Sequence, residues 1–600
     1  MAKKYIDVMD TTFRDGFQSV FGGRVLMEDF LPAVEKARDI GITHFEFGGG
    51  ARFQSLFFYL RENAFEMMKK FREAAGPEAN LQVLARGINT VMLDTGSREM
   101  IDLFAKLFAK YETTTVRNFD ALNDIRNLEY SGAAIKKNGM LHEVVVTLMD
   151  LPPGCSGAHD VPFYEKKVRE ILDSGIEFDS IAFKDASGTS SPAKIYDTIK
   201  MARRLLGDDV HIRLHTHETA GVSVAGYLAA LDAGVDGIDL ACAPVSGGTS
   251  QPDMLTLLHA TKGMNYNLGD LELHKVLEYQ EFLKECLKDY FIPPEATQVN
   301  PLIPFAPMPG GALTANTQMM RDNGTLDKFP EVLKAMTEVV EKGGYGTSVT
   351  PVSQFYWQQA YANVVFGPWK QIAPGYGKMV LGYFGRTPVA PDPEIVELAS
   401  KQLKLEPTTE NPLDIADRDE KKSIAYWKKV LEEEGLETTE ENIFIAASCD
   451  KKGIAFLKGE SPLMVRKKGL MEEENQEKGT KMAKSGPEVY TVVVNGKKYN
   501  VQIAEGGDAN IEVVQSQETA APAPVEGGKG HIEIRSQTPG NVWKILKDVG
   551  DKVEEGDVIM ILEAMKMEIE IAAPEAGVIK SIDVAVNDSV SDGQLLATLG

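Results

Sequence analysis

The sequence predicts an α/β protein that consists of a (β/α)8 barrel, a helical domain and a small C-terminal all-β domain of the barrel-sandwich type. Three observations support this prediction. Short apolar runs alternate with amphipathic stretches from residue 5 to about 245, a helical and charged pattern follows to about 470, and an internal repeat occupies the C-terminal region. A chain of 600 residues is too long for one hydrophobic core, so several domains are expected.

The barrel is expected to span residues 1–300. Eight strand-like runs, with amphipathic stretches such as 28–40 between them, fit eight β/α units. Alternation alone would also fit an open doubly wound sheet, so it is the number of units that favours the barrel. The eight runs are YIDVMD (5–10), THFEFG (43–48), LQVLARG (81–87), TTVRNFD (114–120), HEVVVTLMD (142–150), DSIAFKDASG (179–188), VHIRLHTH (210–217) and VDGIDLACAP (235–244).

The second domain is expected at 301–470, and we interpret it as a helical domain that closes the mouth of the barrel. Its first segment, 301–320, is so rich in Pro and Gly that we expect a loop there. A connector follows at 471–530. It contains a predicted β-hairpin at 490–503 and a flexible linker rich in Ala and Pro at 518–530.

The C-terminal domain, 531–600, contains a duplication in which the stretch 540–562 recurs as 577–599. Two copies of one β-unit predict a pseudo-symmetric β-sandwich. Lys566 lies between the copies, in the tetrapeptide Ala-Met-Lys-Met at a predicted hairpin turn. Most surface lysines are only solvated, but a lysine on an exposed tight turn can be reached by a modifying ligase and can then carry a mobile group.

Charge and cysteine content restrict where the protein works. Asp and Glu number 88 against 64 Lys and Arg, which gives a net charge of −24. This balance disfavours nucleic acid and anionic membranes as partners. The N-terminus lacks the apolar stretch of a signal peptide, and no apolar run has the length of a membrane-spanning helix. Four cysteines without a C-x-x-C pair favour the cytoplasm.

Four polar side chains are predicted at strand ends on one rim of the barrel, which is the rim where barrel enzymes build their active sites. They are Asp15, Lys184, His215 and His217. The two histidines are two residues apart in one strand, so both imidazoles point to the same side. Taken singly, Asp15 could cap a helix and Lys184 could form an ion pair. Together, two imidazoles and a carboxylate predict a divalent-metal site for Zn, Mn or Co.

Several runs between residues 5 and 355 resemble the carboxyltransferase domain of pyruvate carboxylase, oxaloacetate decarboxylase and transcarboxylase. They include TTFRDGFQS, LARGIN, FKDASG, LHTHE, SGGTSQP, MPGGALTAN and SVTPVS. The tetrapeptide around Lys566 resembles the biotinyl carrier domain of the same enzymes, and it lacks the Asp-Lys-Ala that is usual in lipoyl domains. The sequence is identified as a member of the biotin-dependent carboxyltransferases, most similar to the separate biotinylated carboxyltransferase subunit of two-subunit pyruvate carboxylases.

The resemblance implies a role for each matched residue. These roles are metal binding for Asp15, His215, His217 and a carbamylated Lys184, binding of a 2-oxo acid for Arg14, Gln18 and Arg86, proton relay for Thr350, and covalent biotin on Lys566. The implied chemistry is reasonable. Addition of CO2 turns a lysine that would repel a metal ion into an anionic ligand, and guanidinium groups suit planar carboxylates. A turn hydroxyl before Pro351 is the simpler interpretation of Thr350.

Four positions depart from the usual family pattern. Phe17 replaces a histidine, Gly48 a tryptophan, Arg52 a threonine and Gln354 a lysine. None of them is an implied metal ligand. An arginine at position 52 could lie near the mouth and alter the recognition of charge.

The resemblance also implies partners. The sequence lacks a P-loop and has no room for an ATP-grasp domain, so a separate ATP-dependent biotin carboxylase subunit is expected, as are a biotin protein ligase, a 2-oxo acid such as pyruvate, and a homo-oligomer. Two relatives remain alternatives: the α subunit of sodium-pumping oxaloacetate decarboxylase, with a membrane partner, and the large subunit of 2-oxoglutarate carboxylase. A biotin-independent aldolase or acyl-CoA lyase, or an inactive scaffold, would leave parts of the chain unexplained. The reversible chemistry leaves the physiological direction open.

Overall fold

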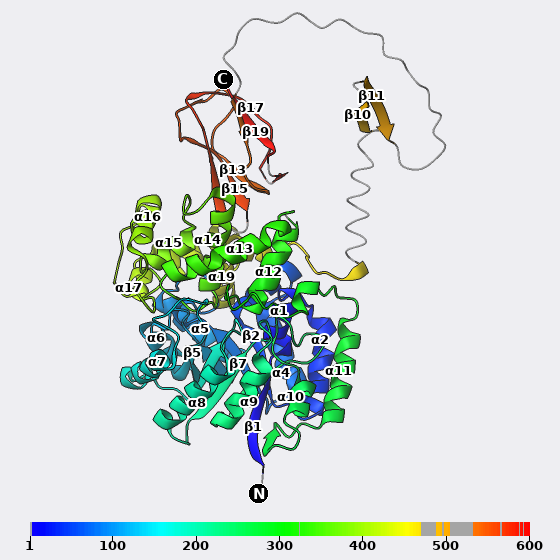
Figure 1. Ribbon diagram of the computed structural model, residues 1–600, viewed down its shortest axis with the longest axis vertical. Coiled ribbons are helices and arrows are strands. Elements are labelled where there is room, and N and C mark those ends of the chain that lie inside the picture. Colours follow the sequence, from blue (N-terminus) through cyan, green and yellow to red (C-terminus); the bar gives the residue numbers. More distant parts are fainter. Residues whose placement is uncertain are drawn as a thin grey trace, which may run out of the picture.

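The computed structural model describes residues 3–322, 324–469, 488–494, 497–503, 532–564, 567–586, 588–591 and 593–600. Lys566, the turn between the hairpin strands, and the predicted solvated and Ala/Pro-rich parts of the connector lie outside these residues. Figure 1 shows the barrel, the helices above it and the C-terminal β-domain at the top.

The predicted barrel is confirmed. Its strands are parallel in the order β2-β3-β4-β5-β6-β7-β8-β1, and the pairing of β1 with β2 closes the ring, so this is a TIM barrel. All eight predicted runs form strands, and β-branched or aromatic residues, which favour strands, occur in each run. The strands are β1 Lys4–Asp10, β2 His44–Gly49, β3 Asn80–Ala85, β4 Thr115–Asn118, β5 Leu141–Thr147, β6 Ser180–Asp185, β7 His211–Thr216 and β8 Gly237–Leu240, and β9 Tyr266–Leu268 adds to the edge of β1.

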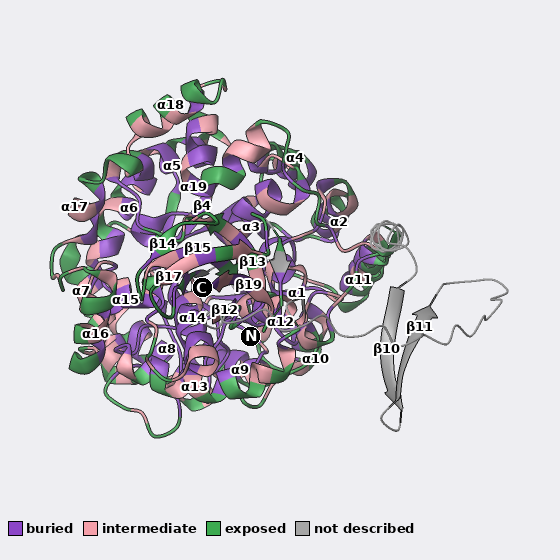
Figure 2. Ribbon diagram, turned by 90° about the horizontal axis from the view of Figure 1, so that it is seen from above, coloured by how far each residue is buried: buried purple, intermediate pink, exposed green. Residues whose placement is uncertain are grey.

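Amphipathic helices surround the barrel and bury their apolar faces against it, as Figure 2 shows. The predicted stretch 28–40 is helix α2. The surrounding helices are α1 Phe17–Phe21, α2 Met27–Asp39, α3 Gly50–Ser55, α4 Ala64–Ala75, α5 Arg98–Lys110, α6 Arg126–Lys137, α7 Val161–Ser174, α8 Pro192–Leu206, α9 Ser223–Ala233, α10 Met254–Ala260 and α11 Leu273–Leu287.

A helical region follows the barrel, and its first helices share a hydrophobic cluster with residues at the barrel mouth. The prediction of a loop throughout 301–320 is wrong, because helix α12 begins at Gly310. Pro309 and the two glycines after it lie at the helix start, where the first N–H groups need no partner within the helix, and the remaining residues favour helix. The helices are α12 Gly310–Asp322, α13 Phe329–Lys342, α14 Val352–Phe366, α15 Pro374–Val380, α16 Pro393–Leu403, α17 Pro412–Asp417, α18 Ile424–Glu433 and α19 Glu440–Leu457.

The C-terminal domain is the predicted pseudo-symmetric sandwich, made of two four-stranded sheets. Their orders are β12-β19-β17-β14 and β16-β15-β13-β18, so each copy of the repeat contributes strands to both sheets. The strands are β12 Ile532–Arg535, β13 Gly540–Ile545, β14 Lys552–Val553, β15 Val558–Ala564, β16 Met567–Ala572, β17 Gly577–Ile582, β18 Ser589–Val590 and β19 Leu595–Leu599. Strand β15 pairs with β16 up to Ala564 and Met567, and Lys566 falls between these two residues in the sequence.

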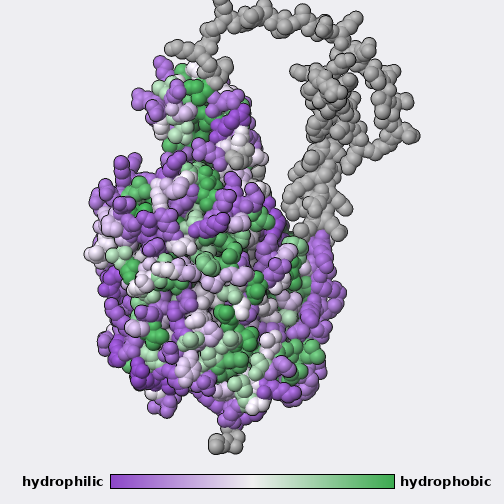
Figure 3. Space-filling view, in the orientation of Figure 1, coloured by the Kyte–Doolittle hydropathy of each residue, from purple (hydrophilic) through white to green (hydrophobic). Residues whose placement is uncertain are grey.

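The predicted hairpin of the connector is also present, as the antiparallel strands β10 Glu488–Val494 and β11 Lys497–Ile503. On the face shown in Figure 3, hydrophilic side chains surround smaller hydrophobic areas. No helix in the part of the chain that the structure describes combines the length and the apolar character needed to cross a membrane.

Candidate active site

The four predicted rim residues come together at the carboxyl ends of three barrel strands. Asp15 lies in a π-helical turn, Thr12–Gly16, directly after β1. Lys184 lies in β6 and His215 in β7, and His217 follows the end of β7 by one residue. All four side chains are buried. The barrel therefore places residues that are far apart in the sequence around one point.

The donor atoms of three of these residues converge. Oδ2 of Asp15 lies 3.2 Å from Nε2 of His215 and 3.2 Å from Nε2 of His217. The two Nε2 atoms are 3.1 Å apart. A carboxylate and two imidazoles at such distances form a ligand set suited to a divalent transition metal.

Hydrogen bonds on the far side of each ring fix the tautomers. Nδ1 of His217 donates to the backbone oxygen of Thr249 at 2.7 Å, and Nδ1 of His215 donates to Oδ2 of Asp239 at 2.8 Å. In the neutral imidazoles both Nε2 atoms then carry lone pairs, which face each other and the carboxylate. Burial of these electron pairs is unfavourable without a cation between them, so the residues present fit a bound metal.

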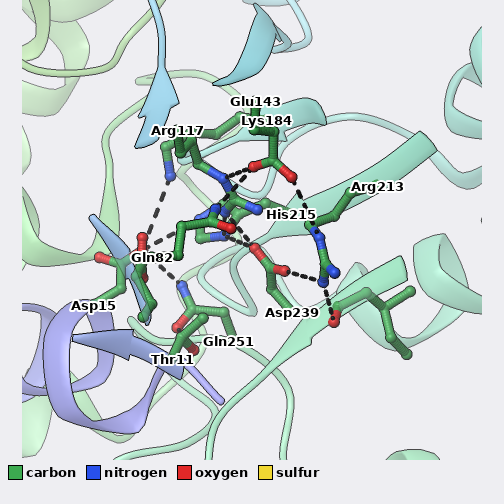
Figure 4. A network of polar contacts seen from close by, with 12 residues as sticks. Thr11, Asp15, Gln82, Arg117, Glu143, Lys184, Arg213, His215, Asp239 and Gln251 are labelled. Carbon is green, nitrogen blue, oxygen red and sulfur yellow. Dashed lines mark hydrogen bonds and ion pairs between the residues drawn. The ribbon is translucent and has the colours of Figure 1, made fainter. Parts of the chain in front are cut away.

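Asp239 belongs to a buried network of charges beneath the site, which Figure 4 shows. Arg117 bonds Asp239 at 2.5 Å, and Arg213 bonds it at 3.0 Å. Burial alone would raise the pKa of Asp239, but these guanidinium groups and the His215 bond hold it well below its usual range. Asp239 therefore stays ionised and orients His215.

Lys184 lies beside the donor set, with Nζ 3.9 Å from Oδ2 of Asp15. Burial, opposed by the nearby Asp15 carboxylate, lowers the pKa of Lys184 to about 8. Burial would raise the pKa of Asp15, but the positive charge of Arg14, with smaller effects of Lys184 and of the hydrogen bond with His215, holds it well below the ordinary value. The site thus holds an ionised carboxylate next to an amine that loses its proton easily.

The remaining predicted barrel residues line the same pocket. Arg14, Gln18, Arg86 and Thr350 surround a space of about 380 Å³, which includes its opening to solvent, together with Asp15, Lys184 and His217. Pro309, Gly311 and Val349 form the wall on the side of the helical region. The structure therefore brings the predicted barrel residues together, with His215 buried just behind the pocket lining.

Arg86 is a buried cation that satisfies its donors with backbone groups only. Its NH1 donates to the oxygens of Val91 at 2.7 Å and Met92 at 3.0 Å, and Nε has no partner. Burial, with a smaller effect of Arg14, lowers the pKa of Arg86 to about 9. Within the described part of the chain no carboxylate forms an ion pair with Arg86. A pocket wall of this kind favours an anionic ligand.

Besides Asp239, two further residues around the site, Gln251 and Glu46, were not predicted from the sequence. Nε2 of Gln251 lies 3.0 Å from Oδ2 of Asp15 and 3.0 Å from Nε2 of His217. Glu46, from β2, is fully buried and forms an ion pair with Arg14. Gln251 belongs to the run SGGTSQP, which matched the family, but an amide in a loop has no titratable group that would single it out.

The four departures from the family pattern do not alter the donor set. Phe17 is buried and packs edge-on against Phe13 and Phe30. Gly48 is buried behind Val83. Arg52 does not line the pocket, contrary to the expectation that it lies near the mouth. It is fully buried and donates to the backbone oxygens of Gly23 and Val25.

Gln354 is the fourth departure and lies four residues after Thr350. It lies in the first turn of α14. Its Nε2 is buried and has no hydrogen-bond partner. The replacement of a lysine by this amide leaves the start of α14 with an unused donor and one positive charge fewer.

Comparison with known proteins identifies two family domains. The sequence profile described as "Conserved carboxylase domain" matches residues 303–505, and the one described as "Biotin-requiring enzyme" matches 532–599. The chain is 31% identical to one subunit of pyruvate carboxylase from Methanocaldococcus jannaschii, over 94% of each chain. It is 30% identical to "Methylmalonyl-CoA carboxyltransferase 5S subunit" of Propionibacterium freudenreichii subsp. shermanii, over 83% of this chain and 97% of that one.

A solved structure supports the same relationship. The carboxyl transferase domain from Rhizobium etli pyruvate carboxylase with 3-bromopyruvate is similar at a TM-score of 0.68 and 25% identity, over 76% of this chain and 77% of that chain. The barrel, the biotin-requiring domain and relatives that match over nearly their whole length agree with one another. The chain therefore belongs to the biotin-dependent carboxyltransferases, the enzyme family that includes the carboxyltransferase subunits of pyruvate carboxylase.

Proposed function

We propose that the barrel pocket transfers a carboxyl group between biotin on Lys566 and a 2-oxo acid, with pyruvate and oxaloacetate as the substrate pair. The observation that carries this proposal is one pocket that combines the Asp15 and His217 donors, the unpaired Arg86 cation and the Thr350 hydroxyl. The names of the relatives supply the substrate, because pyruvate carboxylase subunits from two organisms match over nearly the whole chain.

The metal ligands in this proposal are Asp15, His215 and His217, with a carbamate on Lys184 as the fourth. When bound, a divalent ion supplies Lewis-acid polarisation of the substrate keto oxygen, which is worth several kcal/mol in reactions of this type. Lys184 needs its neutral amine to add CO2. Burial favours that form, because the pKa of Lys184 falls to about 8. The carbamate would replace a buried cation by an anion next to the donor set.

Other residues of the same pocket would bind and orient the substrate. Arg86 offers its unused donor to the carboxylate of the 2-oxo acid, and Arg14 and Gln18 hold the keto end beside Asp15. Arg14 is itself held by Glu46 and by Asp15, 3.2 Å away. A guanidinium fixed in this way meets the substrate without reorganising, which is the basis of electrostatic preorganisation.

Thr350 moves the proton. Its hydroxyl would accept the proton that leaves the methyl carbon of pyruvate and would pass its own proton to the biotin that supplies the carboxyl group when bound. The new carbon–carbon bond forms at that methyl carbon and gives oxaloacetate. Thr350 lies on the wall of the pocket that the helical region contributes, while the barrel contributes the metal donors. Each step is reversible.

The relatives also suggest the partners. The archaeal relatives are named as one subunit of pyruvate carboxylase, which implies another, and we infer that an ATP-dependent biotin carboxylase loads the carrier. A biotin protein ligase would modify Lys566, and a homo-oligomer in the cytoplasm agrees with the family. The relative named "2-oxoglutarate carboxylase large subunit" is 28% identical, so 2-oxoglutarate is the alternative substrate.

The test is isotope exchange between labelled pyruvate and oxaloacetate, catalysed by the purified biotinylated chain without ATP. We expect exchange with the wild type, none with Lys566→Arg, and at least a hundredfold less with Lys184→Ala. Undiminished exchange in Lys184→Ala would contradict the assignment of the barrel site. Exchange with 2-oxoglutarate but not with pyruvate would replace the substrate and keep the chemistry.

A further inference from the structure

Described residues of the carrier domain, which spans 532–600, contact the helical region. The hydroxyl of Tyr361 lies 3.3 Å from Oγ1 of Thr538. Nζ of Lys451 lies 4.4 Å from the ring centre of Trp543. Phe366, at the end of α14, packs against the core of the carrier. Figure 1 shows the carrier standing on these helices.

These contacts lie at the end of the carrier that presents the biotinylated turn. Strand β13 pairs with β15 so that Asn541 faces Glu563. Glu563 is followed directly by Ala564, the last residue of β15, and Lys566 comes two residues later in the sequence. Asn541, in the segment from Thr538 to Trp543, therefore lies beside the end of β15 that precedes Lys566.

The internal repeat of the carrier shows that its fold does not require Trp543. A shift of 37 residues matches Gly540 with Gly577 and Trp543 with Lys580. Lys580 is exposed on its strand, whereas Trp543 is partly covered and its buried Nε1 has no hydrogen-bond partner. At the equivalent position of the two copies, the second has the exposed Lys580, whereas the first has Trp543, whose ring contacts Lys451.

The backbone of α19 is not helical at the residue before Lys451. Asp450, the preceding residue, has φ 49° and ψ −137° in the interior of α19. A residue with a side chain is strained in this region, and such strain persists where the surrounding structure requires it. The break redirects the chain immediately before Lys451, which is exposed and lies over Trp543.

Both contacting helices also lead to the pocket. Helix α14 begins two residues after Thr350 and ends at Phe366, under the carrier. Helix α19 is bonded to α3, the helix that follows β2, where Nε2 of Gln54 donates to the oxygen of Ser448 at 2.7 Å. The carrier therefore rests on elements that form or support the pocket walls.

We propose that Tyr361, Phe366 and Lys451 form a docking surface for the carrier domain of the same chain, with Trp543 and Thr538 as its counterparts. The proposal deepens the proposed function, on which it rests, by naming where the carrier sits when its biotin serves the pocket. Within the described residues, none of the contacts named here is an ion pair. Such an interface is weak enough for a carrier that must also leave.

The test uses the full-length biotinylated chain with Trp543→Lys, the residue that the second copy of the repeat carries at this position. The fold should tolerate it, and a lysine there replaces a cation–π contact by repulsion. We expect exchange through the attached biotin to fall about fivefold or more, because a cation–π contact is worth roughly 1 kcal/mol. Lys580→Ala and Lys452→Ala are the matched controls, and mass spectrometry confirms equal biotinylation.

Two further measurements separate the possible failures. The first measures activity with free biotin in two variants, Lys566→Arg alone and Lys566→Arg combined with Trp543→Lys. Both should have the same activity, because the barrel pocket is intact in each. Hydrogen exchange should show that 361–366 and 449–457 lose protection in Trp543→Lys whatever the activity.

Equal behaviour of Trp543→Lys and Lys580→Ala in both assays would overturn the docking surface. Protection that depends on protein concentration would assign the carrier to a second copy and overturn docking within one chain. Absence of any wild-type exchange would contradict the proposed function alone.

Discussion

Two buried arginines show how the same interaction serves different purposes. Arg86 and Arg52 are both enclosed, and each donates to two backbone oxygens. Burial lowers the pKa of Arg86 to about 9 and that of Arg52 to about 10. Only Arg86 lines the pocket. A buried guanidinium therefore indicates a binding role only when it also faces a cavity.

This difference gives a matched pair of variants. Arg86→Lys keeps a positive charge but loses the planar fork, so KM for pyruvate should rise roughly tenfold or more while kcat changes little. Arg52→Lys should leave KM unchanged and lower only the stability. Steady-state kinetics of carboxyl transfer measures both. A KM that changes equally in both variants would contradict the role of Arg86.

Thr350 is expected to act in the chemical step rather than in binding. Thr350→Ala removes the proton relay, so kcat should fall by about 10²–10⁴-fold, whereas calorimetry should show unchanged pyruvate binding. Thr350→Ser keeps the hydroxyl and should restore most of the rate. An alanine variant with more than half of the wild-type kcat would show that another group carries the proton.

The pKa of Lys184 predicts how carbamate formation depends on pH. Only the neutral amine adds CO2, and its fraction increases as the pH rises through about 8, the pKa that burial produces. In metal-free protein with ¹³C-bicarbonate, the NMR carbamate signal should therefore increase mainly between about pH 7 and 9. Lys184→Ala should lack this signal. An increase that begins only above pH 9 would indicate an ordinary lysine.

The residues that sequence reasoning identified and those that it missed differ in kind. His215 and His217 were predictable because charge and spacing on one strand are visible in the sequence. Gln251 and Asp239 act through hydrogen bonds to those histidines, and such contacts exist only once β7, β8 and the following loop are assembled. For Arg52 the prediction was wrong. Its charge suggested a position near the barrel mouth, but it is buried away from the pocket and donates to backbone oxygens.

At the level of elements, the strand pattern was predictable and the start of α12 was not. The barrel strands are parallel and are covered on both faces, so they appear in the sequence as short, largely apolar runs. Pro and Gly near residue 310 indicated a loop. In the structure they start a helix instead. The glycine at 310 meets a packing requirement, because a Cβ at that position would lie 1.6 Å from the carbonyl oxygen of Thr249.

Helix α19 joins the helical region to the barrel through an aromatic cluster. Phe444 is buried, and its ring lies 5.7 Å from that of Phe53 and 6.2 Å from those of Phe104 and Phe108. Rings at these distances add to the apolar burial that holds two elements together. The helix therefore belongs to the barrel core as much as to the region that follows it.

This packing predicts that the barrel and α19 unfold together. Phe444→Ala should lower the free energy of unfolding by about 3–5 kcal/mol in a single urea transition. Phe282→Ala, on the exposed side of α11, removes a ring that is 41% exposed and should lower it by less than about 1 kcal/mol. Two separate transitions, with the barrel midpoint unchanged in Phe444→Ala, would contradict the shared core.

For the whole molecule, the sequence predicted the barrel, the helical region and the carrier, because each has its own periodicity or repeat. It could not predict how the carrier meets the helices. That contact depends on Trp543 and Lys451, which are about ninety residues apart and belong to no shared pattern. Contacts between domains follow from surface shape, and shape appears only after each domain has folded.

The central claim is that biotin on the carrier delivers its carboxyl group to the barrel pocket. The most direct measurement is a single turnover in which the chain, carboxylated beforehand on biotin with ¹³C, is mixed with pyruvate. The account predicts labelled oxaloacetate from the wild type, and none from Thr350→Ala within the same time. Labelled oxaloacetate formed at the wild-type rate by Thr350→Ala, or pyruvate left unchanged while free CO2 is released by the wild type, would contradict it.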